Sequence, residues 1–263
     1  MKKKFWFIML ILGVFTAVGC SKTESSKKEI KYYDNDFITA LQDGLVSRWD
    51  EVDKEEKKEN FKESGSSYKK WVDLELTQIK KFEDLKFKDS KLKEYAISYI
   101  NELKEGEKIS ETFGSESFDG KWYEHQNRRT ELLVNINKIH KLKVPNEEKE
   151  TLKELLAGGK EVEQNNKNEQ VVKDFVNKIE FARNEEKSDE YTSYYEVTVE
   201  NTTGLTIKEL GIEVKLIDAN GVVVDTKYIN ATNWTKNEKR LLEFMAFEDF
   251  AKTEYVVSYQ ETE

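Results

Sequence analysis

The spacing of hydrophobic residues changes late in the chain. Between residues 34 and 157, apolar side chains recur every three or four positions, which is the spacing of helices with one buried face. After Asp189, apolar and polar residues alternate, as they do in strands that are buried on one side. The pattern therefore predicts an α+β fold, in which an N-terminal helical bundle is followed by a separate small antiparallel β-sandwich.

Five helices are expected in the first part of the chain. Asp34 or Asp36 is expected to cap the first of them. Residues that favour caps, turns or helix ends separate the helices and lie at 64–67, 89–90, 106–120, 144–145 and 158–159. The stretch 106–120 is expected to be a long loop, and the pair Gly158-Gly159 is expected to end the fifth helix.

Five or six short strands are expected in the second part. The clearest turn between them is Asp218-Ala219-Asn220-Gly221, because Asn-Gly accepts the positive φ of a tight hairpin. Its acid and amide also resemble the start of a calcium loop, but valines follow where ligands are required, so we interpret it as a turn. The stretch 169–181 fits both helical spacing and, in part, alternation, and we expect a helix that passes into a strand near Ile179.

The first twenty residues have the composition of an export signal. Three lysines, Lys2 to Lys4, precede an uncharged run that ends in Ala17-Val18-Gly19-Cys20. The apolar run of about 15 residues is shorter than the ~20 that a helix needs to cross a membrane. This segment resembles a bacterial lipoprotein signal with its lipobox, as found in Gram-positive bacteria. The resemblance implies cleavage before Cys20, diacylglycerol and acyl groups such as palmitate on Cys20, and a lipid-anchored location on the extracytoplasmic face of the cell membrane.

A second resemblance covers the C-terminal part. The hairpin from Leu216 to Val223 is similar to that of the FxLYD-type domain, a small immunoglobulin-like sandwich of exported Gram-positive proteins. Asp218 agrees with the motif that names the family, whereas Val214 and Ile217 stand in place of its Phe and Tyr. The resemblance implies an Ig-like β-sandwich outside the cytoplasm, and it carries no catalytic residues.

These patterns divide the chain into five segments. They are a signal peptide at 1–19, a lipidated tether at 20–33, a helical bundle domain at 34–158, a junction at 159–177 and an FxLYD-like β-sandwich domain at 178–263. The tether is rich in Ser and Lys and has no hydrophobic period, and the junction is polar and rich in amides.

Composition and charge narrow the possible functions. Hydrophobic residues make up 37% of the 263 residues and charged residues 36%, which predicts a folded protein with a very hydrophilic surface. The formal net charge is −9, and a negative body is repelled by nucleic acid and by an anionic bilayer, so no nucleic-acid partner is expected. Cys20 is the only cysteine, so once it is acylated no intrachain disulfide can form.

Residues that could support catalysis or bind a metal are scarce. His125 and His140 are the only histidines and are fifteen residues apart on the fourth predicted helix. That spacing is more than about 20 Å of helix, so the two cannot share a metal ion, and we interpret both as surface residues. No serine is framed by glycines near them, and the sole cysteine serves as the anchor. We therefore predict no catalytic residue, no metal site and no cofactor.

Three aromatic residues are candidates for binding a partner. Phe113 and Phe118 lie in the predicted loop, and Trp234 lies between turn residues at one end of the predicted sandwich. For Trp234 we favour the alternative that it plugs the sandwich core. The leading interpretation is a non-enzymatic lipoprotein that binds or scaffolds an envelope protein or a cell-wall component. The alternative is a cell-wall-acting enzyme, or an inhibitor of one, with Glu111 and Glu116 beside the loop aromatics.

Overall fold

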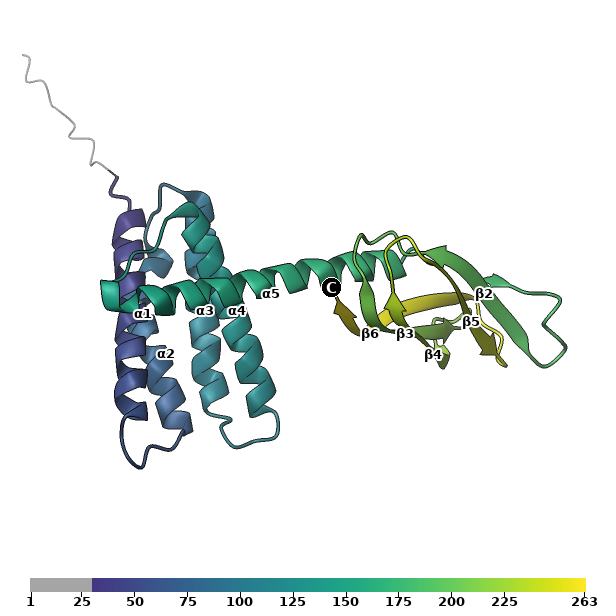
Figure 1. The fold of residues 1–263 in the computed structure, drawn as a ribbon, viewed down its shortest axis with the longest axis horizontal. Helices are drawn as coiled ribbons and strands as arrows, with labels where there is room; N and C mark the ends of the chain where they lie inside the picture. Colours follow the sequence, from purple (N-terminus) through teal and green to yellow (C-terminus); the bar gives the residue numbers. More distant parts are fainter. Residues whose placement is uncertain (1–29) are drawn as a thin grey trace, which may run out of the picture.

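The computed structural model describes residues 30–263. The predicted signal peptide, Cys20 and most of the predicted tether lie outside the described residues. The described chain combines five α-helices with two three-stranded antiparallel sheets (Figure 1). The predicted α+β class is therefore confirmed at this level.

Four helices lie side by side in the N-terminal part, which we call the helical region. They are α1 (Asp34–Glu56), α2 (Gly65–Ile79), α3 (Ser90–Ser110) and α4 (Phe118–Ile139), with a 3-10 helix η1 (Lys80–Asp84) after α2. Their apolar stripes meet in one core, whose fully buried members include Phe37, Leu41, Leu45, Val72, Ile79, Leu92, Ile100, Leu103, Leu133 and Ile136. None of the helices within residues 30–263 is both long and apolar enough to span a membrane.

The start of α1 is held differently from the prediction. Asp89 caps α3 as expected, because its carboxylate accepts from the backbone N–H groups of Lys91 and Leu92 at 2.8 and 2.9 Å. Asp34 and Asp36, in contrast, do not cap α1, which has no side-chain hydrogen bond at its N-cap. The Asp34 carboxylate accepts from the backbone N–H groups of Lys88 and Asp89 at 2.8 and 2.9 Å. Asp34 therefore ties the start of α1 to the start of α3.

The fifth helix continues where the sequence predicted its end. After the 3-10 helix η2 (Asn146–Glu148), α5 (Lys149–Val176) runs unbroken through Gly158-Gly159, so the predicted helix end there is wrong. A Cβ on Gly159 would lie 2.5 Å from the backbone oxygen of Thr130 in α4. The glycine therefore lets α5 approach α4 closely, and the polar residues that follow it are helical. The ambiguous stretch 169–181 is helical as far as Val176.

The C-terminal part, which we call the β region, contains six strands. One sheet has the order β1 (Ala182–Arg183), β2 (Ser193–Glu200), β5 (Lys239–Ala246), and the other has the order β4 (Val223–Trp234), β3 (Ile207–Ile217), β6 (Lys252–Thr262). Along β5, alternate residues are buried, as the period of two predicts. The predicted turn at 218–221 links β3 to β4, and its Gly221 has a φ of 84°.

The helix α5 contributes to two separate cores. Leu152, near its start, belongs to the core of the helical region. Val172, Phe175 and Val176, near its end, belong to a second core that both sheets share. Figure 1 shows α5 leading from the four helices to the strands. The two parts of the molecule are therefore joined through one continuous helix.

Candidate functional site

Phe113 and Phe118 lie together where α3 turns into α4. Because α3 continues to Ser110 and α4 begins at Phe118, only residues 111–117 form the turn, and the predicted loop at 106–120 is too long. The two rings meet edge to face with centroids 5.0 Å apart. The turn from α1 to α2 lies at the same end of the helical region (Figure 1). We call this end, residues 53–66 and 107–121, the distal end.

Tyr68 in α2 is the centre of an aromatic cluster at the distal end. Its ring centroid lies 5.6 Å from Phe113, 5.1 Å from Phe118 and 4.6 Å from Trp122. Tyr68 and Phe118 are buried and Trp122 is half-buried, whereas Phe113 is 40% exposed. Of these four rings, Phe113 is thus the one that offers most of its surface to solvent, and the others support it.

Two glycines shape this turn. Gly114 follows Phe113 with a φ of 83°, a left-handed conformation that glycine adopts without steric cost. A Cβ on Gly65 would lie 2.5 Å from the backbone oxygen of Ser110 and 3.2 Å from the Cβ of Phe113. Gly65 therefore allows the start of α2 to pack directly against the turn, which fixes the position of Phe113.

The distal end is acidic. It contains nine carboxylates and six lysines. Glu111 and Glu116, the carboxylates of the enzyme hypothesis, both lie in the turn and are exposed. Burial raises the pKa of the Tyr68 phenol to about 12, with a further contribution from Glu63, so Tyr68 is neutral. The chemistry of this end suits a partner that offers an apolar group to Phe113 and basic groups to the surrounding carboxylates.

A buried ionic cluster joins the four helices in the core. Arg48 Nη1 donates to Glu75 Oε1 at 2.9 Å, and Arg129 donates through Nε and Nη2 to the two Glu75 oxygens at 3.2 and 2.5 Å. The Tyr99 hydroxyl also donates to Glu75. Burial alone would raise the pKa of Glu75, but Arg129 and Arg48 outweigh it and hold that pKa below its usual value. Glu75 is therefore the ionised centre of the cluster.

The sequence interpretation missed Glu75, although a signal was present. Glu75 follows Val72 by three positions and precedes Ile79 by four, so it stands on the apolar stripe of α2. A carboxylate on the buried face of a helix needs charged or hydrogen-bonding partners, because burying it alone is costly. Arg129 stands on the apolar stripe of α4 in the same way.

The prediction that both histidines are surface residues is wrong for His125, which is fully buried. Its Nδ1–H donates to Glu102 Oε1 at 2.7 Å, and its Nε2 has no hydrogen-bond partner among residues 30–263. A Cβ on Gly106 would lie 2.5 Å from His125 Cε1, so this glycine makes the space for the ring between α3 and α4. His140 is half-buried at the end of α4.

His125 is expected to make stability depend on pH. Burial lowers the pKa of His125 below its ordinary value of 6.5, although Glu102 partly opposes this. The unfolded chain then binds a proton more readily than the folded chain, so the stabilisation is complete above pH ~6.5 and is lost as the pH falls through the lower folded pKa. Burial acts against Glu102 ionisation, but hydrogen bonds from His125 and Arg128 lower the pKa of Glu102, which adds a similar loss only below its ordinary value of 4.5.

Urea unfolding at a series of pH values tests this expectation. Between about pH 7 and pH 5 the free energy of unfolding should fall for the native chain, and the fall should be smaller for His125→Gln. His140→Gln, which changes the other histidine, should keep the native pH dependence. The same pH dependence in the native chain and in His125→Gln would contradict the role given to His125.

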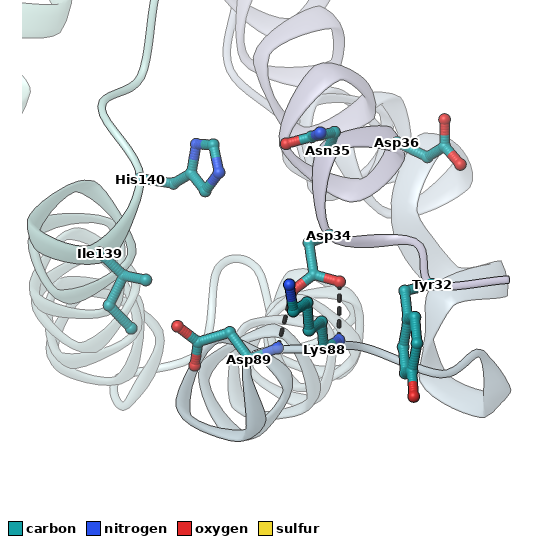
Figure 2. Close-up of a pocket in the computed structure, with 8 residues that line it drawn as sticks. All are labelled: Tyr32, Asp34, Asn35, Asp36, Lys88, Asp89, Ile139 and His140. Atoms are coloured by element: carbon teal, nitrogen blue, oxygen red, sulfur yellow. Dashed lines mark hydrogen bonds between the residues drawn. The ribbon is translucent and has the colours of Figure 1, made fainter. Parts of the chain in front are cut away.

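An open hollow of about 710 Å³ lies at the opposite end of the helical region, where the described chain begins. Figure 2 shows the hydrogen bonds that the Asp34 carboxylate accepts from the backbone N–H groups of Lys88 and Asp89. His140 lies on the other side of the hollow. We call this end, residues 30–36, 80–93 and 139–143, the tether end. The described part of the chain contains no group of three or more His, Cys, Asp or Glu side chains placed to hold a metal ion.

Trp234, the third predicted binding residue, is fully buried in the β region. Its Nε1–H donates to the backbone oxygen of Glu238 at 2.9 Å, and its ring meets Phe175 of α5 at 5.5 Å. This is the placement that the plug interpretation predicts. A buried ring leaves no surface for a partner, so Trp234 does not form part of the candidate site.

Comparisons with protein-family models, with curated proteins and with solved structures find no match for this chain. The candidate site is therefore defined by its own geometry: Phe113, the aromatic rings that support it and the acidic residues around it.

Proposed function

We propose that this chain is a bacterial lipoprotein that binds or scaffolds another component of the cell envelope without catalysing a reaction. Acyl groups on Cys20 anchor it to the extracytoplasmic face of the cell membrane, and the four helices act as a bundle that carries the binding site. The observation that carries the proposal is Phe113, an aromatic ring 40% exposed at the distal end and supported by buried rings. Supported aromatic residues of this kind are common anchors in protein interfaces.

The position of Phe113 relative to the tether supports this role. The predicted tether directly precedes α1. The helix α1 has 23 residues, which corresponds to a length of about 35 Å. The distal end lies at the other end of α1 (Figure 1). A partner could therefore reach Phe113 while the chain remains attached to the membrane.

The β region fits the scaffolding part of the proposal. Its two antiparallel sheets share one core, which is compatible with the Ig-like β-sandwich that the FxLYD resemblance implies. The helix α5 holds this region apart from the tether end, since its 28 residues span about 42 Å. The protein would thus present two surfaces to the envelope, one helical and one formed by the sheets.

Chemical crosslinking in intact cells tests the site. Phe113→Ser should reduce the yield of the crosslinked partner at least about tenfold, the loss typical of an interface anchor. Tyr123→Ser is the matched control, because Tyr123 is an aromatic residue of α4 that is 68% exposed, and it should leave the yield unchanged. Turnover of peptidoglycan that Glu111→Gln or Glu116→Gln abolishes would instead favour the cell-wall enzyme.

An experiment in the same cells tests whether Cys20 anchors the chain to the membrane. Cys20→Ala removes the acyl acceptor, so the chain should leave the membrane fraction and appear in the medium or remain as an uncleaved precursor. The measurement is cell fractionation combined with incorporation of a labelled fatty acid. Membrane association unchanged by Cys20→Ala, with no fatty-acid label on the native chain, would contradict the lipoprotein assignment.

A further inference from the structure

The two ends of the helical region carry opposite charge. Nine lysines and five carboxylates lie at the tether end, whereas nine carboxylates and six lysines lie at the distal end. The lysines of the tether end are Lys31, Lys80, Lys81, Lys86, Lys88, Lys91, Lys93, Lys141 and Lys143. The chain as a whole is negative, with a formal net charge of −9, so the tether end differs in sign from the chain as a whole.

The fold brings these lysines together from three separate segments. The backbone N–H of Tyr33 donates to the Lys86 oxygen at 2.9 Å, which places the start of α1 beside the loop before α3. The backbone N–H of Lys143 donates to Gln42 Oε1 at 2.6 Å, which places the segment after α4 beside α1. Residues of all three segments line the hollow in Figure 2, where Lys88 lies with Asp34, Asp36 and Asp89.

Much of the positive charge is free to act on a ligand. Lys86, Lys88, Lys141 and Lys143 are exposed, and none of them has a carboxylate at ion-pair distance within residues 30–263. Most carboxylates of the tether end, in contrast, already have hydrogen-bond or ion-pair partners. Asp34 accepts from two backbone N–H groups, as described above, and Glu83 pairs with Lys104 at 2.7 Å.

Apolar residues lie next to these lysines. Ile30 is 53% exposed and Tyr32 is 47% exposed, on either side of Lys31. Exposed tyrosine beside lysine is typical of segments that lie in the headgroup layer of a bilayer. Cys20 precedes Ile30 by ten residues, a length of chain that spans at most about 35 Å when fully extended.

We propose that the tether end is a docking face for anionic lipid headgroups, so that the helical region stands on the membrane by this end. The inference rests on the proposed anchor at Cys20, which keeps the face close to the bilayer. Lysines near an anionic surface are attracted over a Debye length of about 10 Å at 0.1 M salt. The acidic distal end is repelled by the same surface, so both ends favour one orientation.

Lysine labelling of the full-length lipidated chain tests the orientation. The chain is reconstituted in vesicles of phosphatidylcholine alone or of phosphatidylcholine mixed with phosphatidylglycerol, and amine acetylation is measured residue by residue. Phosphatidylglycerol should slow acetylation of Lys86, Lys88, Lys141 and Lys143 at least about threefold, and ~1 M salt should reverse the effect. The exposed lysines of the distal end should react equally in both vesicles, which provides a control within the same molecule.

Charge-reversed variants separate docking from other causes of protection. Replacing Lys86, Lys88, Lys141 and Lys143 together with Glu should abolish the slower labelling of the neighbouring Lys80 and Lys81. The matched control replaces four exposed distal lysines with Glu and should leave that protection intact; these are Lys57, Lys58, Lys62 and Lys121.

The outcomes distinguish docking from anchoring. Equal labelling of the tether-end lysines in both kinds of vesicle, on a chain that floats with both, would overturn the docking face and leave the anchor in place. A chain that does not float even with phosphatidylcholine would overturn the anchor and the docking face together. Protection by soluble poly(glycerol phosphate) but not by anionic vesicles would overturn the lipid assignment in favour of a soluble polyanion.

Discussion

Glu75→Gln is expected to destabilise the helical region by about 3–5 kcal/mol. This is the typical cost of removing one partner of a buried ion pair and leaving the other charge buried without compensation. The substitution leaves two buried guanidiniums, Arg48 and Arg129, without the carboxylate that both contact. Their side chains are 8% and 2% exposed, so water cannot compensate for the lost charge. The measurement is urea unfolding followed by the helical circular dichroism signal.

Two further variants identify the cause of that loss. Glu94→Gln removes a carboxylate whose pair with Lys91 is exposed, and it should change the free energy of unfolding by less than about 0.5 kcal/mol. Arg48→Met, Glu75→Leu and Arg129→Met combined remove all three charges, and this variant should recover most of the lost stability. If Glu75→Gln lowered the free energy of unfolding by less than about 1 kcal/mol, the ion pairs of the cluster would not be what stabilises the helical region.

Trp234→Ala is expected to destabilise the β region by about 3–5 kcal/mol, as truncation of a large buried aromatic residue does. The ring is fully buried against Phe175 of α5, so truncation leaves a cavity. It also removes the hydrogen bond from the indole Nε1–H to the Glu238 backbone oxygen, which keeps its second bond, from the Asn201 N–H at 3.0 Å. Urea unfolding followed by the β-sheet circular dichroism signal measures the effect.

Tyr228→Ala is the control for that variant, because Tyr228 is also an aromatic residue of β4 and is 66% exposed. It should cost well under 1 kcal/mol. If Trp234→Ala were equally mild and also reduced crosslinking of a partner in cells, the plug interpretation would be wrong and Trp234 would return to the list of binding residues.

Much of the fold could be predicted because the relevant signals are local. Helical spacing identified α1 to α4, the change to alternation identified β2 to β6, and an Asn-Gly turn identified the hairpin at 218–221. The failures occurred where a residue's role depends on a distant neighbour. Gly159 indicated a helix end by itself, but its actual role is to allow contact with Thr130 of α4.

The candidate site was predictable only in part, for a similar reason. The sequence singled out Phe113 and Phe118, but the ring that joins them, Tyr68, comes from another helix. His125 looked like a surface residue because its space is made by Gly106, which lies on the neighbouring helix. A single sequence does not reveal which residues of two helices face each other at a given height.

The continuity of α5 has a mechanical consequence. A pull between the membrane anchor and anything bound to the β region would pass through the helical region and along α5. Its start is held by Leu152 in the first core, whereas its middle is attached to α4 by the close approach of Gly159 to Thr130 and by the 2.5 Å pair of Glu163 with Lys138. None of the α5 side chains between Leu156 and Val172 belongs to either core, so these contacts bury little apolar surface and would yield before either core does. The molecule could thus lengthen under load by peeling α5 from α4 and shorten again when the load is removed.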